Sequence, residues 1–268
     1  MKEFRGAMLL PLKPICLFRR TCFFLFLPCF ALLSALNAVA QTRMGDGYYA
    51  RVNTFGVLAA YSNDSSHMLL GDAERRKLVN IGGMYSRRLF LNRIVNWEYT
   101  AELLPVALES DPLTTELDLQ TSPTPATATL NNGSPLITCA PFTLQYSFAY
   151  EGVTYAGTNV FYCHGRQWTI GEAMSPVGFS WNFRTRHKLQ PFLIGHGGYM
   201  YSTRPIPVES AGSFNFTFDL GAGLELFRTH AQSIRAEYRY HHISNHFTAY
   251  ENPGIDSGLV QLTWSFGR

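Results

Sequence analysis

The sequence is short of cysteine, and most of the cysteine it has lies near its beginning. Cys16, Cys22 and Cys29 fall within the first forty residues, which leaves only Cys139 and Cys163 in the rest of the chain. These two lack the paired spacing of zinc-binding cysteines, so no zinc site is expected. In an exported protein, two cysteines most simply form one disulfide bond, and we predict that Cys139 and Cys163 do so.

Long apolar segments are also missing, except for one near the N-terminus. It runs from Cys22 to Ala40, follows several basic residues, and ends in small residues just before Gln41. These are the features of a secretory signal peptide, predicted over 1–40, with the mature domain over 41–268. No apolar run of about twenty residues follows, which excludes a helical membrane span in the mature chain.

The mature chain lacks net charge as well. The first forty residues contain five of the 22 basic residues and one of the 19 acidic ones, so the remainder is nearly neutral. A neutral chain offers no basic surface to nucleic acid, and no such partner is expected. Phosphate-binding loops and dinucleotide fingerprints are absent too, and we expect no cofactor.

What the chain does have is aromatic residues, 14% of the total, in segments that alternate between apolar and polar side chains. The alternation is clear at 95–103, 177–184, 214–226 and 260–266, and a period of two predicts strands with one apolar face. A soluble β-sandwich would alternate similarly. Two features favour a membrane barrel: the strands approach the ten residues that cross a bilayer, and aromatics gather toward strand ends.

We therefore predict an all-β fold, an eight-stranded antiparallel transmembrane β-barrel. The strands are expected near 47–61, 77–90, 94–109, 170–184, 189–203, 212–228, 232–245 and 256–266. Tight turns alternate with long links along the chain, and outer-membrane barrels place the long links outside the cell. The longest link, at about 110–169, is predicted to be a flexible extracellular loop that the cysteines tie down.

Candidate catalytic residues gather near the C-terminus, in Tyr240-His241-His242-Ile243-Ser244-Asn245 and at Asp256. Residues two apart on a strand share a face, so His242 and Ser244 point to the same side. Arg235 and Arg239 must face the lumen, since Arg in the middle of a bilayer costs about 2–4 kcal/mol. Parity then directs His242, Ser244 and Asp256 outward, toward lipid. A base, a hydroxyl and an acid on one surface are the components of an activated nucleophile.

Each of these residues taken alone also fits a capped strand end, but the three together favour catalysis. A metal site of His241, His242 and His246 is not expected, because adjacent residues of a strand lie on opposite faces. The remaining charges are predicted to form an ion-pair network in the lumen, from Glu98, Glu102, Asp219, Glu225, Arg235 and Arg239.

The His-x-Ser-Asn pattern at 242–245, followed by Asn252-Pro253-Gly254-Ile255-Asp256, resembles the lipid A 3-O-deacylases, also called acyloxyacyl hydrolases. The resemblance implies a serine esterase of the Gram-negative outer membrane that removes a 3-O-linked acyl chain from the lipid A of lipopolysaccharide. It implies that Ser244 is the nucleophile, His242 the general base and Asp256 the orienting acid. Asn245 would help to stabilise the oxyanion. A homodimer is compatible with the sequence.

The chain departs from this family at three points. The acid is usually glutamate, the link at 110–169 is longer than expected, and the chain ends in Phe266-Gly267-Arg268 rather than on an aromatic residue. Two other functions stay open: a non-catalytic structural or adhesive barrel, and a serine acyl hydrolase or acyltransferase acting on another membrane lipid. Eight strands leave no wide channel, which argues against a porin.

Overall fold

A computed structural model describes residues 47–120, 128–131 and 141–268. The predicted signal peptide and Cys139 lie outside these residues. Within them, no helix is long and apolar enough to cross a membrane.

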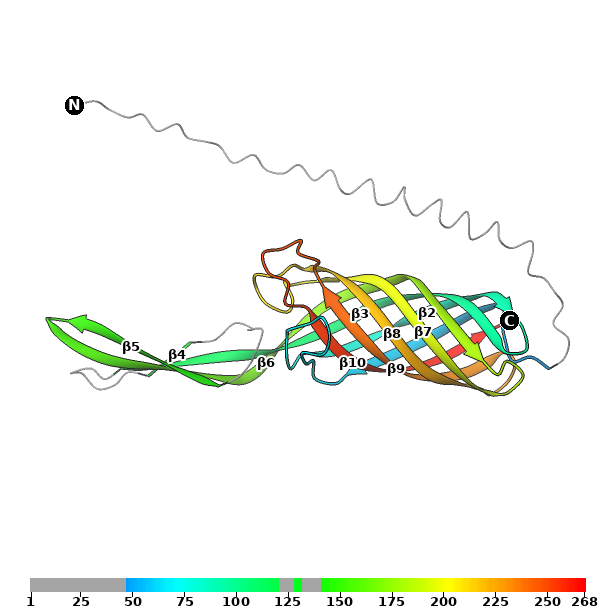
Figure 1. Ribbon diagram of the computed structural model, residues 1–268, viewed down its shortest axis with the longest axis horizontal. Helices are drawn as coiled ribbons and strands as arrows, with labels where there is room; N and C mark the ends of the chain where they lie inside the picture. The colour runs from blue at the N-terminus through cyan, green and yellow to red at the C-terminus, as the bar shows by residue number, and fades with distance from the viewer. Residues whose placement is uncertain (1–46, 121–127, 132–140) are drawn as a thin grey trace, which may run out of the picture. The chain divides into compact units, whose positions relative to one another are not determined.

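The described residues form ten strands in one antiparallel sheet, and eight of the strands close into a barrel (Figure 1). Closure comes from pairing between β3 and β6, the first and last of these eight strands in the sheet order. The predicted eight-stranded antiparallel barrel is thus confirmed. Its strands are β1 (Asn53–Ser62), β2 (Lys77–Leu91), β3 (Val95–Gln120), β6 (Val153–Phe183), β7 (Leu189–Ser202), β8 (Phe214–Phe227), β9 (Gln232–Ser244) and β10 (Ile255–Gly267).

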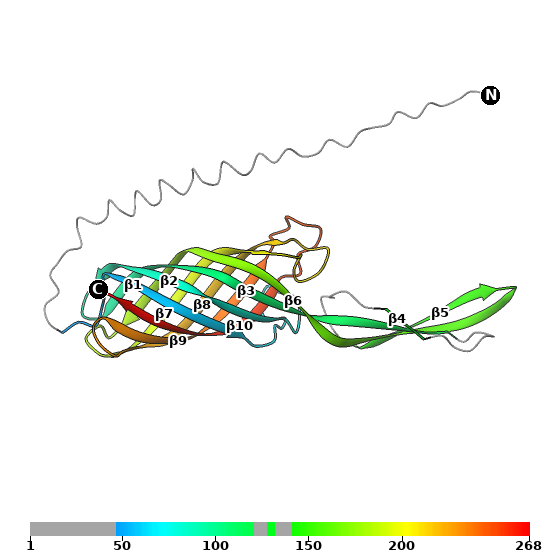
Figure 2. The same ribbon diagram turned by 180° about the vertical axis from the view of Figure 1, so that it is seen from behind.

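The segment 110–169 is a strand hairpin over most of its described length, and the expectation of a flexible loop there is corrected. β3 and β6 remain paired from Ser110 and Trp168 out to Gln120 and Gly157, beyond the point where β2 begins. Two short strands, β4 (Ala128–Asn131) and β5 (Phe142–Tyr150), add to the outer edges of this hairpin (Figure 2). Cross-strand pairing satisfies the backbone groups that a loop would leave to water. Cys163 lies in β6 and is disulfide-bonded.

The barrel presents an apolar exterior, as the alternation predicts. Outward residues of β8, β9 and β10 are large, apolar and about half exposed, and they form a continuous belt through cross-strand pairing. Such a belt is stable only against lipid, because a soluble protein rarely exposes so large an apolar surface. The belt includes Leu220, Leu224, Ile234, Tyr238, Val260, Leu262 and Trp264.

The lumen changes character along the barrel. Arg235, Glu237 and Arg239 of β9 are buried inside it, whereas Leu78, Ile243 and Leu259 are buried apolar residues at the strand ends nearest the long links. The links 63–76, 203–213 and 245–254 and the β3–β6 hairpin lie at this end, and the tight turns lie at the other. The candidate site lies on the outer face of the barrel at the end with the long links.

Candidate active site

The three candidate residues occupy the loop end of β9 and β10. His242 and Asp256 are directly opposite each other in the β9–β10 ladder, and Ser244 follows two residues beyond His242 on the same face. On β9 the inward residues are buried while the outward ones are partly exposed, so His242 and Ser244 face outward as predicted. Strand register alone therefore gathers a histidine, a hydroxyl and a carboxylate on one surface.

Asp256 is the most constrained residue of the group. Its Oδ1 lies 2.6 Å from His242 Nδ1 and accepts a hydrogen bond from the Tyr240 hydroxyl at 2.8 Å. Its Oδ2 accepts hydrogen bonds from the backbone nitrogens of Leu69 and Leu70, each at 2.8 Å. The side chain is fully buried although it lies on the outer face, because the link 63–76 covers it. Sequence reasoning did not anticipate this cover.

In this conformation, Ser244 hydrogen-bonds to residues of the β9–β10 link rather than to His242. Its Oγ donates to Asn252 Oδ1 at 3.0 Å and accepts from the His246 backbone nitrogen at 3.1 Å. His246 and Phe247 have φ values of 51° and 58°, the left-handed region that costs energy for residues with side chains. The chain therefore turns sharply just after the serine. Among the described residues, Ser244 makes no hydrogen bond to His242.

Asn245 builds this link from within. It is buried, its Nδ2 donates to the Glu251 carbonyl at 2.6 Å, and its Oδ1 accepts from the Phe247 backbone nitrogen at 2.9 Å. One amide hydrogen of the side chain is left for another acceptor. The structure thus shows a loop-building role for Asn245 beside the predicted oxyanion role.

Apolar side chains surround the site on the outer surface. Phe216 and Phe218 of β8 pair with Ser244 and His242 in the β8–β9 ladder, and both are exposed on the outward face. On the other side, Leu69 and Leu70 are 73% and 65% exposed even though their backbone nitrogens bind Asp256. A polar site bordered in this way is suited to a substrate whose reactive group lies among hydrocarbon chains.

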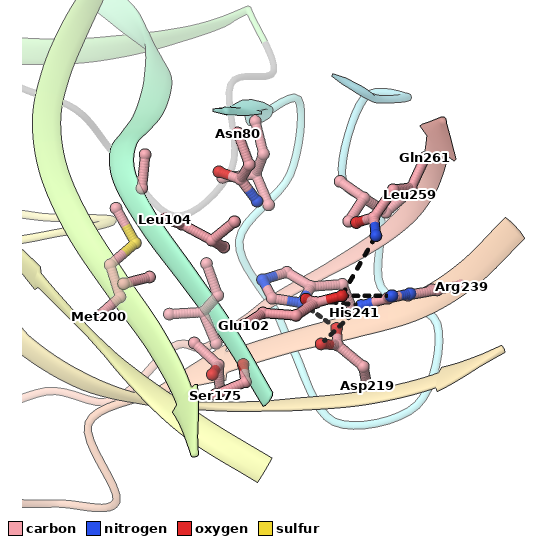
Figure 3. A pocket seen from close by; sticks show the side chains of 15 residues that line it. Asn80, Glu102, Leu104, Ser175, Met200, Asp219, Arg239, His241, Leu259 and Gln261 are labelled. Carbon is pink, nitrogen blue, oxygen red and sulfur yellow. Dashed lines mark hydrogen bonds and ion pairs between the residues drawn. The ribbon is translucent and has the colours of Figure 1, made fainter. Parts of the chain in front are cut away.

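The lumen holds a second cluster of polar side chains, directly behind β9. Figure 3 shows Glu102, Arg239 and Asp219 converging there. Arg239 Nη2 lies 2.7 Å from Glu102 Oε1 and 3.0 Å from Glu237 Oε1, and Nη1 lies 3.6 Å from Asp219 Oδ2. His241 binds Asp219 as well.

These contacts confirm the predicted ion-pair network in the lumen. Arg235 pairs with Glu98 at 3.9 Å. Glu225 pairs with Arg51 at 2.7 Å, and sequence reasoning did not identify Arg51 as a member of the network. Charges that would be costly in the bilayer thereby compensate one another inside the barrel.

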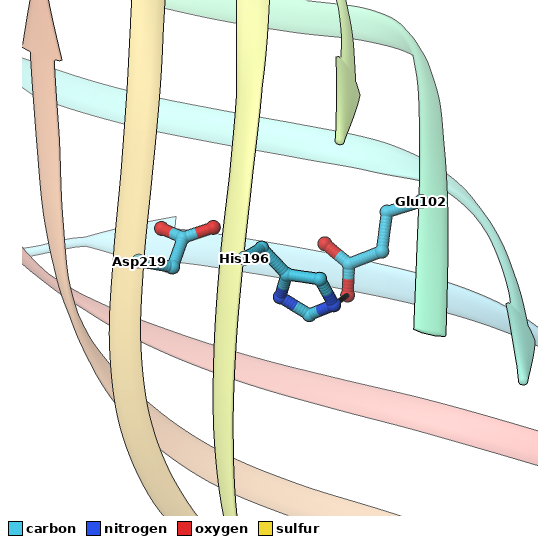
Figure 4. Close-up of side chains that lie close together, drawn as sticks. All are labelled: Glu102, His196 and Asp219. Carbon is cyan, nitrogen blue, oxygen red and sulfur yellow. Dashed lines mark ion pairs between the residues drawn. The ribbon is translucent and has the colours of Figure 1, made fainter. Parts of the chain in front are cut away.

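Three of the lumen residues also have the spacing of metal ligands. Ligand atoms of Glu102, His196 and Asp219 lie within 4.8 Å of one another (Figure 4). The guanidinium of Arg239, however, already supplies positive charge to both carboxylates and lies 3.2 Å from His196 Nδ1. Together these contacts favour a structural role for the lumen cluster.

Comparison with known families bears on this geometry. Residues 138–265 match the family model described as "Lipid A 3-O-deacylase (PagL)". The resemblance to the lipid A 3-O-deacylases is confirmed. The match includes β5 to β9, most of β10 and the outward site.

Solved structures with similar folds are distant in sequence. The crystal structure of the outer membrane enzyme PagL is 13% identical, with a TM-score of 0.44 over 80% of this chain and 99% of that one. The crystal structure of Neisserial surface protein A (NspA) is 11% identical, with a TM-score of 0.40 over 81% of this chain and 97% of that one. No curated protein matches the sequence.

Proposed function

We propose that this protein is an outer-membrane serine esterase that removes the 3-O-linked acyl chain from lipid A. One observation carries the proposal: Asp256 and His242 are bonded at 2.6 Å on the outer face, with Ser244 on that same face two residues along β9. A structural acid–histidine pair would be cheaper in the polar lumen, where the other charges lie. An acid–histidine pair on the outer face can act on a reactant that comes from the membrane.

The proposed reaction begins with Ser244. Its hydroxyl leaves Asn252 by rotation about the Cα–Cβ bond, a change between staggered rotamers, and donates to His242 Nε2. His242 takes the proton while Oγ attacks the ester carbonyl, and Asp256 holds the imidazole by its Nδ1 and stabilises the imidazolium. Catalytic hydrogen bonds commonly tighten only once substrate is bound.

Collapse of the tetrahedral intermediate completes the first half-reaction. The carbon–oxygen bond to the sugar breaks, and the departing 3-oxygen takes the proton from His242. This leaves a free hydroxyl on lipid A and an acyl group on Ser244. Water then attacks the acyl-enzyme with His242 as base, and the fatty acid departs. We propose that the remaining amide hydrogen of Asn245 and the nearby His246 backbone nitrogen stabilise the oxyanion.

The orientation of the barrel decides which lipid reaches the site. The site lies at the end with the long links, which outer-membrane barrels direct away from the periplasm. Lipopolysaccharide occupies the outer leaflet, so its ester-linked chains would approach sideways along the apolar surface of Phe216, Phe218 and Leu70. This placement supports lipid A over a periplasmic substrate.

Mass spectrometry of lipid A from cells that express the protein tests the proposal. We expect loss of one ester-linked hydroxyacyl chain, which Ser244→Ala and His242→Gln abolish. The adjacent histidine provides a matched control: His241 faces the lumen, so His241→Gln should leave the lipid A modification in place. Unchanged lipid A with a correctly inserted barrel would refute the function, and deacylation by Ser244→Ala would refute Ser244 as the nucleophile. Release of fatty acid from phospholipid alone would replace lipid A with another substrate.

A further inference from the structure

We infer that the β1–β2 link, together with Tyr240, is a positioning device for the catalytic acid, an inference that rests on the proposed function. The link contributes the backbone N–H groups of Leu69 and Leu70, and Tyr240 contributes its hydroxyl. None of the three touches the reacting atoms. They act through Asp256 on the orientation of His242.

The count of hydrogen bonds supports this role. An ionised carboxylate offers about four acceptor positions, two on each oxygen. Among the described residues, Leu69 N and Leu70 N bind Oδ2, Tyr240 and His242 bind Oδ1, and the Gly71 backbone adds a further hydrogen bond. The carboxylate is therefore saturated and cannot turn without breaking hydrogen bonds. An imidazole bonded to such an acid is fixed in orientation and in tautomer.

The link is built to approach the acid closely. At Gly71, a Cβ atom would lie 2.6 Å from the Asp256 backbone nitrogen and 3.0 Å from its Oδ1, so only glycine fits. On either side of this glycine, the link is tied to the strand. Ser66 N donates to the Asp256 carbonyl at 3.2 Å, and Ala73 N donates to the Gly254 carbonyl at 3.0 Å. The donors are thus anchored by backbone hydrogen bonds and not by their own side chains.

This arrangement explains how an aspartate can stand where the resemblance leads us to expect glutamate. The shorter side chain reaches His242 because the two residues are directly opposite in the ladder. The link then fills the space above the acid and replaces water with fixed donors. Preorganised support of this kind is what catalytic groups require for full efficiency.

Steady-state kinetics with purified protein and lipid A in detergent micelles test the inference through two pairs of variants. Leu70→Pro removes the backbone donor, whereas Leu70→Ala keeps the donor and removes the exposed side chain. Tyr240→Phe deletes only the hydroxyl. Tyr238→Phe is its control, since Tyr238 lies on the same face two residues earlier and pairs with Val260 in the β9–β10 ladder.

We expect Leu70→Pro and Tyr240→Phe each to lower kcat about 10-fold with KM nearly unchanged, the effect of losing one hydrogen bond to a charged group. Tyr238→Phe should keep the parental kcat and KM, whereas Leu70→Ala should raise KM by removing apolar contact with the substrate and leave kcat at the parental value. Heat-modifiable gel mobility verifies that each barrel is folded. Parental kcat in both Leu70→Pro and Tyr240→Phe, or equal losses in Leu70→Ala and Leu70→Pro, would overturn the inference. Absence of lipid A deacylation by the folded parental protein would instead overturn the proposed function, whatever the link variants do.

Discussion

The substitution Asp256→Glu gives the sharpest prediction, because glutamate is the acid usual in the family that the chain resembles. An exchange toward the family's usual residue would ordinarily be expected to preserve activity or raise it. Here we expect the opposite, since the link 63–76 is closed around the shorter side chain.

The magnitude follows from the contacts of the acid. One extra methylene moves the carboxylate by about 1.5 Å, the length of a carbon–carbon bond. Asp256 Oδ1 is already within 2.6 to 2.8 Å of His242 and Tyr240, so the longer acid must push the imidazole or open the link. Misplacing a catalytic group by about 1 Å can cost about 100-fold in rate, or about 2.7 kcal/mol. We therefore expect kcat to fall about 100-fold.

The assay is release of the 3-O-acyl chain from purified lipid A, with heat-modifiable mobility as the measure of folding. Asp256→Asn provides the reference for complete loss of the acid, expected at about 10⁴-fold from the behaviour of serine triads. Asp256→Glu should fall between this variant and the parent. If Asp256→Glu matched or exceeded the parental kcat in a folded barrel, the link would not be fitted to the shorter acid, and the reasoning would be refuted.

Three further predictions concern the barrel itself. Arg239→Leu leaves Glu102 buried without its cation and should reduce the free energy of unfolding by about 3–5 kcal/mol, measured by urea unfolding in lipid vesicles. Leu262→Arg puts a charge on the outward belt and should cost about 2–4 kcal/mol in the same assay; no loss would contradict the membrane-facing assignment. Cys163→Ser should preserve heat-modifiable mobility and lipid A deacylation if the disulfide only ties the hairpin; loss of the folded barrel would show that it does more.

The barrel can be predicted from the sequence because its cause is local. Alternation with a period of two fixes which face of a strand is apolar, and expensive charges such as Arg235 and Arg239 then fix which face is inside. The parity of His242 follows from theirs, so strand parity correctly predicts that this histidine faces outward. Partners across the lumen are harder to predict. Arg51 lies far from Glu225 in sequence, and nothing local connects the two.

The prediction of a loop at 110–169 is wrong for a different reason. The Thr, Pro and Ala content of this segment indicates irregular structure, yet Phe142, Leu144, Tyr146, Phe148 and Tyr150 alternate just as the barrel strands do. That alternation is a local signal for a strand, and composition alone obscures it. The alternation is less clear from Thr114 to Gln120. There the strand conformation of β3 depends more on pairing with β6 than on its own sequence.

The cover of Asp256 cannot be predicted from side chains at all. The donors from the link are backbone nitrogens, which every non-proline residue has. The identities of Leu69 and Leu70 therefore do not show that these residues bind Asp256. Gly71 is the only trace, and a glycine within a link has many ordinary explanations. A catalytic acid can thus depend on residues whose identity hardly matters, provided that none of them is proline and that the one nearest the acid has no side chain. In this site, side chains supply the chemistry of the triad, whereas backbone groups hold its acid in position.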